Sequence, residues 1–216
     1  MENEKIAVSV LDLSKQFGKE KILKNITQNF EDGKIHGLVG FNGSGKTVLL
    51  KCICGFLKPG RGKIYVYGKE IGKDVDFPED LGLLIENPGF LGNYSGMKNL
   101  KMLADLRKKI SKEDIKRVIT SVGLDWKNKK PVSKYSMGMR QRLAIAQAIM
   151  ENPKLLILDE PFNGLDKSMA EKIRILIKGL RVEGRTIFLV SHNIVDIESL
   201  CDTVFEMDAG KIKQVR

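Results

Sequence analysis

Eight residues of the sequence, GFNGSGKT from Gly40 to Thr47, have the types and spacing needed to hold a chain of phosphates. Gly43 and Gly45 allow the backbone to come close to phosphate oxygens, whose charge is met by peptide N–H groups and a helix N-terminus. Lys46 is placed to reach the β and γ phosphates of a nucleoside triphosphate, and the Thr47 hydroxyl to ligate Mg²⁺. Average composition gives a chance match on the order of 1%, so an ordinary glycine turn is a weak alternative.

A second chemical motif is LLILDEP, at residues 155–161. Its four apolar residues predict a buried strand, and Asp159 at the strand end is placed to face a metal ion. Glu160 is the candidate general base that polarises an attacking water, which favours hydrolysis over phosphoryl transfer to another substrate. Two adjacent carboxylates can also simply be solvated, but a phosphate loop in the same chain weighs against that interpretation.

Two further side chains have both a functional and a structural interpretation. His192 closes the segment TIFLVSH; a histidine after a strand is usually structural, yet the end of a parallel strand is also where ligands bind. Phe17, in LSKQFGK, could stack on an adenine face, although an aromatic side chain in a first strand more often belongs to the core. The residues alone leave both alternatives open.

The elements that must position these groups alternate between strands and helices along most of the chain. The strand at 34–40 runs into the phosphate loop and then into an apolar helix at 46–55, a strand-loop-helix unit. Further strands are expected at 6–13, 22–30, 61–69, 81–86, 154–160, 186–192 and 203–208, with a helix after Asp166 and a short one after His192.

A helical stretch interrupts this alternation. Ser111 caps a helix with an apolar stripe that ends at Gly123, and a second helix follows Ser136. We therefore predict an α/β fold of the P-loop NTPase class, RecA-like, with a mainly parallel sheet, an antiparallel β part and an inserted helical subdomain. The prediction is a single domain, with its core at 1–87 and 153–216 and the helical subdomain at 88–152.

Composition and charge narrow the class of protein. With 216 residues, 42% hydrophobic and 30% charged, the chain has the make-up of one soluble globular domain. Its apolar runs are too short to cross a bilayer and its start, MENEKIAVSV, lacks a signal peptide, so we expect a cytosolic protein. Its three cysteines suit that compartment as reduced thiols, and Cys52 and Cys54 are wrongly spaced on a helix to share a metal.

The net charge of +10 is unevenly distributed. The segment Lys98–Lys134 contains 12 Lys and Arg residues against 4 Asp and Glu residues. Such a segment suits nucleic acid or the anionic cytoplasmic leaflet of a membrane, and a solvated lysine-rich surface is an equal alternative.

The motifs GFNGSGKT, YSMGMRQRL, LLILDEPFNGLD and SH, taken in order, resemble the nucleotide-binding subunit of ATP-binding cassette (ABC) transporters over essentially the whole chain. The family signature L-S-G-G-Q aligns with residues 135–139. By that resemblance Ser136 and Gly138 contact the γ-phosphate held by the other subunit of a dimer, and a loop ending at Asp166 links the two sites. It also assigns His192 to the γ-phosphate and Phe17 to adenine. The expected nucleotide contacts in the phosphate loop are Gly40, Asn42, Gly43, Ser44, Gly45, Lys46, Thr47 and Val48.

Met137 and Met139 depart from the family pattern, where glycine and glutamine stand. Losing a glycine removes backbone freedom and bears on the closed state, but ATP hydrolysis is still expected. Ser136 is also a plausible N-cap, and free amides at a helix start bind anions.

Glu86, at the end of the apolar run GLLIE, stands where most of the family has glutamine. With IENPGF and YSMGMRQRL, it resembles the branch that exports bacitracin-type peptides and lantibiotics and gives immunity or resistance. The resemblance implies that Glu86 interacts with Mg²⁺ and the attacking water, and that its loop contacts the membrane subunit. A carboxylate keeps an oxygen ligand but adds negative charge beside phosphate; a solvent-facing side chain is the alternative.

The leading prediction is thus an ATPase subunit that drives export from the cytoplasmic face of the membrane. It uses ATP and Mg²⁺, forms a homodimer or heterodimer, and works with separate transmembrane permease subunits and no nucleic acid. The second hypothesis is a soluble ABC ATPase acting on DNA or ribosomes. The sequence shows neither the long coiled-coil insertion nor the second cassette that many such proteins carry. A P-loop GTPase or small-molecule kinase is the third, and NKKP at 128–131 fails the guanine-reading N-K-x-D pattern.

Overall fold

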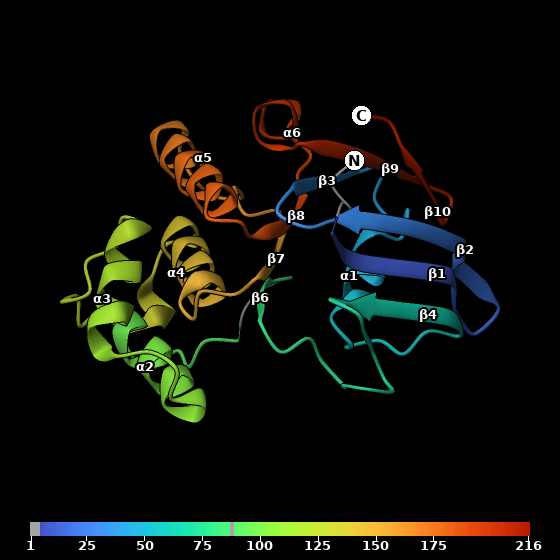
Figure 1. Cartoon of the computed structure of the whole chain (residues 1–216). Helices are drawn as coiled ribbons and strands as arrows, with labels where there is room; N and C mark the ends of the chain where they lie inside the picture. The colour runs from blue at the N-terminus through green and yellow to red at the C-terminus, as the bar shows by residue number, and fades with distance from the viewer. Residues whose placement is uncertain (1–4, 87–88) are drawn as a thin grey trace.

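The computed structural model describes residues 5–86 and 89–216, whose strands form two sheets (Figure 1). The strands are β1 (Ile6–Phe17), β2 (Glu20–Glu31), β3 (Ile35–Val39), β4 (Arg61–Val66), β5 (Lys69–Glu70), β6 (Leu81–Leu84), β7 (Leu155–Asp159), β8 (Thr186–Val190), β9 (Thr203–Asp208) and β10 (Lys211–Gln214). The helices are α1 (Lys46–Ile53), α2 (Gly96–Arg107), α3 (Lys112–Ser121), α4 (Met137–Ile149), α5 (Lys167–Val182) and α6 (Ile194–Leu200), with a 3₁₀ turn η1 at Val132–Lys134.

The larger sheet has the strand order β10-β9-β3-β8-β7-β6, and all its pairs are parallel except β9 with β10. The smaller sheet, β2-β1-β4-β5, is antiparallel throughout. The predicted α/β class, with a mainly parallel sheet and an antiparallel part, is confirmed. Because parallel strands end at the same edge, β3, β7 and β8 bring the segments that follow them together.

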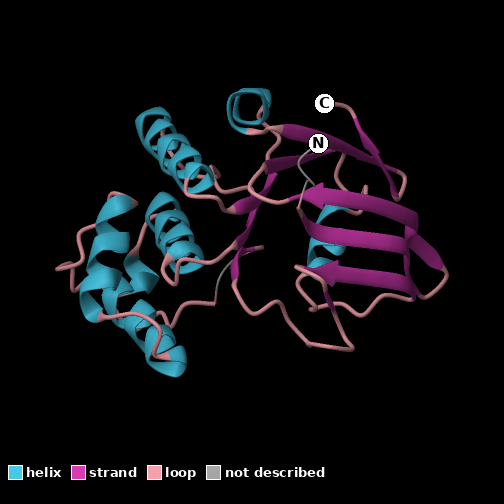
Figure 2. Ribbon diagram, viewed as in Figure 1, coloured by secondary structure: helices cyan, strands magenta, loops and turns pink. Residues whose placement is uncertain are grey.

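Alternating side chains of the buried parallel strands supply both faces of the large sheet. Leu155 and Ile157 of β7 join a core cluster with α1 and the antiparallel sheet. Leu156 and Leu158 point the other way, into a cluster with α4 and α5. Helix α1 is thus packed between the two sheets, and the remaining helices gather on the opposite side of the large sheet (Figure 2).

Helices α2, α3 and α4 lie between β6 and β7 in the chain and cluster together in space (Figure 1). Serine side chains start each of them: Ser95, Ser111 and Ser136 accept a hydrogen bond from the backbone three residues on. Helix α2 was not expected from the sequence, because it buries only Gly96, Asn99, Leu100 and Ala104 and so has a weak apolar stripe. The division into core and helical subdomain at 88 and 152 stays a prediction.

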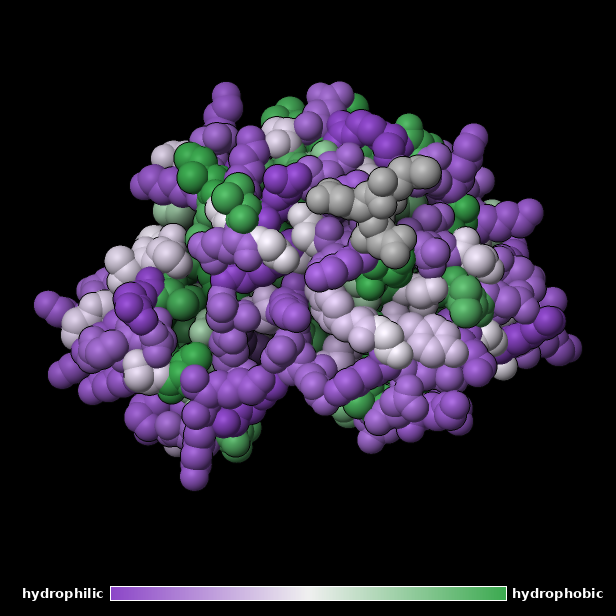
Figure 3. All heavy atoms as spheres, in the orientation of Figure 1, coloured by the Kyte–Doolittle hydropathy of each residue, from purple (hydrophilic) through white to green (hydrophobic). Residues whose placement is uncertain are grey.

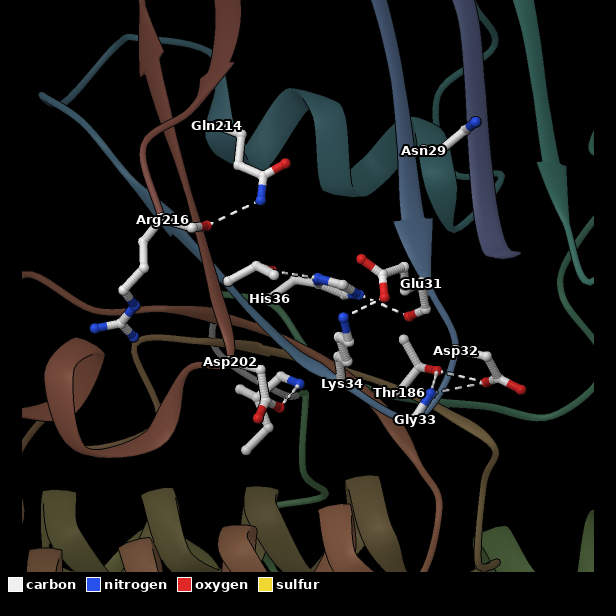
Figure 4. A network of polar contacts seen from close by, with 12 residues as sticks. Asn29, Glu31, Asp32, Gly33, Lys34, His36, Thr186, Asp202, Gln214 and Arg216 are labelled. Carbon is white, nitrogen blue, oxygen red and sulfur yellow. Dashed lines mark hydrogen bonds and ion pairs between the residues drawn. The ribbon is translucent and has the colours of Figure 1, made fainter. Parts of the chain in front are cut away.

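A buried polar network ties the starting ends of the parallel strands (Figure 4). The side chain of His36 is fully buried, with its Nδ1 2.7 Å from the Thr203 hydroxyl and its Nε2 2.8 Å from the Glu31 carbonyl. Burial lowers the pKa of His36 below 6.5, so the ring is neutral at neutral pH. Nearby, the Asp32 carboxylate accepts a 2.7 Å hydrogen bond from the Thr186 hydroxyl. These contacts fix β2, β3, β8 and β9 relative to one another.

All three cysteines, Cys52, Cys54 and Cys201, are free and buried, as expected for reduced thiols. Burial raises the pKa of Cys52 to about 11 and those of Cys54 and Cys201 to about 12. The thiols are therefore protonated at neutral pH.

The surface seen in Figure 3 is mainly hydrophilic, and its apolar areas are scattered. Within residues 5–86 and 89–216, no helix has the length and apolar character needed to span a bilayer.

Candidate active site

The phosphate loop between β3 and α1 has a backbone that only glycine adopts without strain. Gly40, Gly43 and Gly45 have φ values of 137°, 81° and 105°. A Cβ at Gly40 would lie 2.2 Å from the Met207 carbonyl oxygen, so this position also excludes larger residues by contact. The loop is therefore held in one arched shape by β9 behind it.

Two groups in this loop have hydrogen-bonding capacity that suits an anion. The Lys46 ammonium donates to the carbonyl oxygens of Gly40 at 2.7 Å and Phe41 at 3.0 Å, which places it across the mouth of the loop. The Ser44 hydroxyl is buried and has no hydrogen-bond partner among the described residues. A buried hydroxyl without a partner is costly unless a ligand satisfies it, and a phosphate oxygen would do so. The unpartnered Ser44 hydroxyl therefore fits a loop that binds the phosphates of a nucleotide.

Thr47 and Asp159 meet where α1 begins and β7 ends. The Thr47 hydroxyl donates a 3.2 Å hydrogen bond to the Asp159 carboxylate. Burial raises the pKa of Asp159, while the hydrogen bond from Thr47 and the charge of Lys46 oppose that rise. Burial likewise lowers the pKa of Lys46, against the pull of the two carboxylates. A hydroxyl beside a carboxylate is a donor set that suits Mg²⁺ when phosphate oxygens and water complete the shell.

No group of three or more His, Cys, Asp and Glu side chains that could hold a metal occurs in the described part of the chain. Thr47 and Asp159 supply two oxygen ligands of the kind that Mg²⁺ uses together with substrate phosphates.

Glu160 is held in an unusual backbone conformation and faces His192. Its φ is 51°, its N–H donates to the Val190 carbonyl at 3.0 Å, and its own carbonyl accepts a 2.9 Å hydrogen bond from the Gln141 amide. Its buried Oε1 has no hydrogen-bond partner among the described residues and lies 3.5 Å from His192 Nε2. Burial raises the pKa of Glu160, while His192 lowers it, and a raised pKa brings a carboxylate closer to the range of a useful general base.

These groups surround an open cavity of about 510 Å³. It is lined by Phe17, Glu20, Ile22, Asn42, Gly43, Gly45, Lys46, Thr47, Val48, Asp159, Glu160, Val190 and His192. The sequence had not indicated Glu20, Ile22 or Val190, which carry no motif of their own. Phe17 is 48% exposed at the wall of the cavity, so the alternative that it belongs to the core is wrong.

Six of the predicted contacts are not among the residues that line this cavity: Gly40, Ser44, Glu86, Ser136, Gly138 and Asp166. Ser136 caps α4 and accepts a hydrogen bond from the Met139 amide at 3.2 Å, and Asp166 caps α5 in the same manner. Gly138 lies against the loop that follows Glu160, because a Cβ there would be 2.6 Å from the Gly164 carbonyl oxygen. Gly138 and this loop thus touch each other within one chain, and Gly138 is not among the residues that line the cavity.

Glu86 has a different partner from the metal expected for it. Its carboxylate lies 2.5 Å from the Lys51 ammonium of α1, and its side chain is 64% exposed. Its φ of 58° marks a sharp turn at the end of β6. The residues that follow, 87 and 88, lie outside the described part of the chain, and the metal role of Glu86 stays a prediction.

The fold and the site together define a P-loop nucleotide-binding protein. The family model described as ABC transporter matches residues 23–163, which is more than half of the chain. The chain belongs to the ABC transporter ATP-binding family and is an ABC ATPase, which confirms the resemblance stated from the motifs.

Three relatives illustrate the range of similarity. The ABC transporter ATP-binding protein YybJ of Bacillus subtilis is 43% identical over 95% of this chain and 94% of its own length. The bacitracin transport ATP-binding protein BcrA of Enterococcus faecalis is 39% identical over 93% of this chain and 66% of its own length. The lantibiotic transport ATP-binding protein SrtF of Streptococcus pyogenes is 36% identical over 95% of this chain and 88% of its own length.

A solved structure shows the same fold. It is an ATP-binding cassette dimer in a post-hydrolysis state bound to ADP and Pi, with a TM-score of 0.85 and 22% identity over 97% of this chain and 99% of that one. The architecture described above is therefore that of an ABC cassette.

Proposed function

We propose that the chain is the ATP-hydrolysing subunit of an exporter that removes a peptide antibiotic, a lantibiotic or a drug from the cell. The relatives named as bacitracin and lantibiotic transport proteins, which align with more than nine-tenths of this chain, support that class of cargo. The chain acts on the cytoplasmic face of the membrane, bound to separate transmembrane permease subunits. The basic segment Lys98–Lys134, which includes α2 and α3, suits a position near anionic lipid.

One observation carries the enzymatic part of the proposal: Thr47, Asp159, Glu160 and His192 line one cavity at the ends of three neighbouring parallel strands. Lys46 and the loop amides hold the β and γ phosphates, and Phe17 offers its exposed ring to the adenine. Glu160 takes a proton from the attacking water as the water adds to the γ-phosphorus and the bond to ADP breaks. His192 lies beside Glu160 and binds the γ-phosphate.

Thr47 and Asp159 hold Mg²⁺ in this proposal. When bound, the ion neutralises charge that develops on the phosphates. The raised pKa of Asp159 reflects a carboxylate that is buried without a full positive partner, and a cation at that place would supply one.

The chain forms a dimer with itself or with a similar chain in order to complete each site. Ser136 and Gly138 lie outside the cavity of their own chain, which supports a role at the cavity of a partner. Ser136 starts α4, so free amides of its first turn can meet a phosphate there. The loop 163–166, which ends at the N-cap of α5, links the two nucleotide sites of the dimer.

Glu86 couples the nucleotide state to the permease. Its ion pair with Lys51 connects the end of β6 with the helix that follows the phosphate loop. An exposed ion pair is worth roughly 0–1 kcal/mol, so Glu86 can exchange Lys51 for another partner at little cost. A Gln at 86 should preserve most transport and an Ala should uncouple it, with ATP binding intact in both; normal transport by the Ala variant would contradict the role.

The test of the proposed function uses tagged protein with Glu160→Gln, purified from its native host in mild detergent with ATP. Slow hydrolysis should trap the dimer and retain stoichiometric polytopic membrane proteins. The Lys46→Ala variant, which should not hold ATP, is the matched control and should release the dimer. Recovery of nucleic acid or ribosomes in place of membrane proteins would favour the soluble ABC ATPase.

A further inference from the structure

A buried ion pair stands directly behind the His192 turn. Asp196, in the first turn of α6, is fully buried, and the Arg174 guanidinium of α5 donates to its Oδ1 from Nε at 2.8 Å and from Nη2 at 2.6 Å. The Arg174 side chain is 13% exposed. A desolvated pair of this kind is costly to break from one side, since the remaining charge loses its partner.

The second oxygen of Asp196 is engaged by the residue before His192. The Ser191 hydroxyl donates a 2.7 Å hydrogen bond to Asp196 Oδ2 and accepts a 3.1 Å hydrogen bond from the Asn193 amide. Asn193 in turn caps α6 by accepting from the Val195 amide at 3.0 Å. His192 therefore lies between Ser191, which is bonded to the Asp196 carboxylate, and Asn193, whose amide is bonded to the Ser191 hydroxyl.

Arg174 also touches the loop that carries the other member of the site. Its guanidinium carbon lies 5.4 Å from the ring centre of Phe162, two residues after Glu160. A cation over an aromatic face is attractive, and more so where it is desolvated. The Arg174 guanidinium thus contacts both Phe162, in the loop after Glu160, and Asp196, which is bonded to Ser191 next to His192. Arg174 is not among the residues that line the cavity.

We propose that Arg174, Asp196 and Ser191 form a positioning relay that fixes His192 at its distance from Glu160. The three are positioning residues, because none of them lines the cavity. The inference rests on the roles proposed above for Glu160 and His192. It differs from a purely structural ion pair in one respect: cutting the relay at Ser191 should change the chemistry while the ion pair stays intact.

The decisive variant is Ser191→Ala, which removes one hydroxyl and leaves Arg174 and Asp196 paired. We expect kcat for ATP hydrolysis to fall roughly 10- to 100-fold, since small misplacements of a reacting group have effects of that order. KM for ATP should stay within about twofold. A fall in kcat at a nearly constant KM would show that nucleotide binding is intact and that the hydrolysis step is slowed.

Glu171→Gln is the matched control. Glu171 is the exposed partner of Arg174, at 3.0 Å from Nη1 and 63% exposed, and its loss leaves Asp196 and Ser191 untouched. The control should keep the wild-type kcat and KM. A Ser191→Ala protein that is folded and keeps the wild-type kcat refutes the relay.

Two further variants keep the outcome clear. If Ser191→Ala melts far below the wild type, Ser191→Thr, which retains the hydroxyl, carries the test: it should restore kcat, and a folded Thr variant that stays slow contradicts the relay. His192→Ala separates the two proposals. If that protein hydrolyses ATP at the wild-type rate, the role of His192 is wrong; if it is slow while Ser191→Ala is not, only the relay is wrong.

Discussion

Replacing Gly138 by alanine tests the contact between the start of α4 and the loop after Glu160. An added Cβ would stand 2.6 Å from the Gly164 carbonyl oxygen, 3.6 Å from its carbonyl carbon and 3.7 Å from a methyl of Leu165. The nearest of these is backbone, which cannot rotate away as a side chain can. The start of α4 and the Gly164 loop must therefore move apart.

The magnitude follows from the cost of overpacking. Inserting a methyl group into a close contact typically costs about 1–3 kcal/mol. Alanine in place of glycine within a helix returns about 0.5–1 kcal/mol, so the net loss of unfolding free energy should be roughly 0–2.5 kcal/mol. For a chain of this size each kcal/mol shifts Tm by about 2–4 °C, so Tm should fall by up to about 10 °C. The ATPase rate should also fall, and by more than the small loss of folded protein would explain, because the displaced residues are those proposed to meet the partner's phosphate.

The assay is urea unfolding and thermal melting, followed by steady-state ATP hydrolysis over a range of protein concentrations. Gly179→Ala is the matched control, since Gly179 is an exposed residue of α5 whose Cβ would meet nothing within 4 Å. That variant should be more stable than the wild type by up to about 1 kcal/mol, with unchanged activity. A Gly138→Ala protein as stable and as active as Gly179→Ala would refute the reasoning.

Three other predictions concern single groups. Because the pKa of Glu160 in the nucleotide-free protein is raised, kcat/KM for ATP hydrolysis should fall on acidification at a pH above 4.5, the ordinary value of the group. A kcat/KM profile that stays flat down to pH 4.5 would contradict its role as the base. Because burial lowers the pKa of His36 from 6.5, the unfolded chain binds more protons than the folded one near that pH, and the unfolding free energy should fall as pH drops through 6.5. In urea unfolding, His36→Gln should make the unfolding free energy depend less on pH. An equal pH dependence in the two proteins would contradict the burial argument. Ser44→Ala should leave the nucleotide-free protein at least as stable, since it removes an unpartnered hydroxyl, but weaken ATP binding by about 10- to 100-fold as measured by calorimetry; unchanged affinity would show that the hydroxyl meets no phosphate.

The site could be predicted from the sequence where the chemical residues and the strand or helix that positions them lie next to each other in the chain. The phosphate loop and the end of β7 were predicted because glycines, an apolar strand and the charged residues that follow lie within a few positions of one another. Helix α3 was predicted for the same reason, since Ser111 and Asp114 form a capping box and its apolar stripe is regular. The ABC resemblance then placed these pieces in one fold, and the comparisons confirmed the family.

Other features depend on residues far apart in the chain. The pair Lys51–Glu86 and the hydrogen bond from Gln141 to Glu160 join segments that only the folded sheet brings together. Strand β10 is short and polar and exists because it pairs with β9 through a tight turn, so no apolar alternation marks it. In the sequence, Arg174 and Asp196 are two charged residues with no motif of their own, and only the fold shows that they form a buried ion pair.

The buried cysteines have a practical consequence for spectroscopy. Thiol-reactive probes attack exposed thiolates, whereas all three native thiols are protonated and enclosed. A cysteine introduced at an exposed position of α2 and another on the antiparallel sheet could therefore be labelled in the wild-type background. The distance between the two labels would then report how the helices move relative to the sheet as nucleotide binds and is hydrolysed, without first removing the side chains that pack α1 between the sheets.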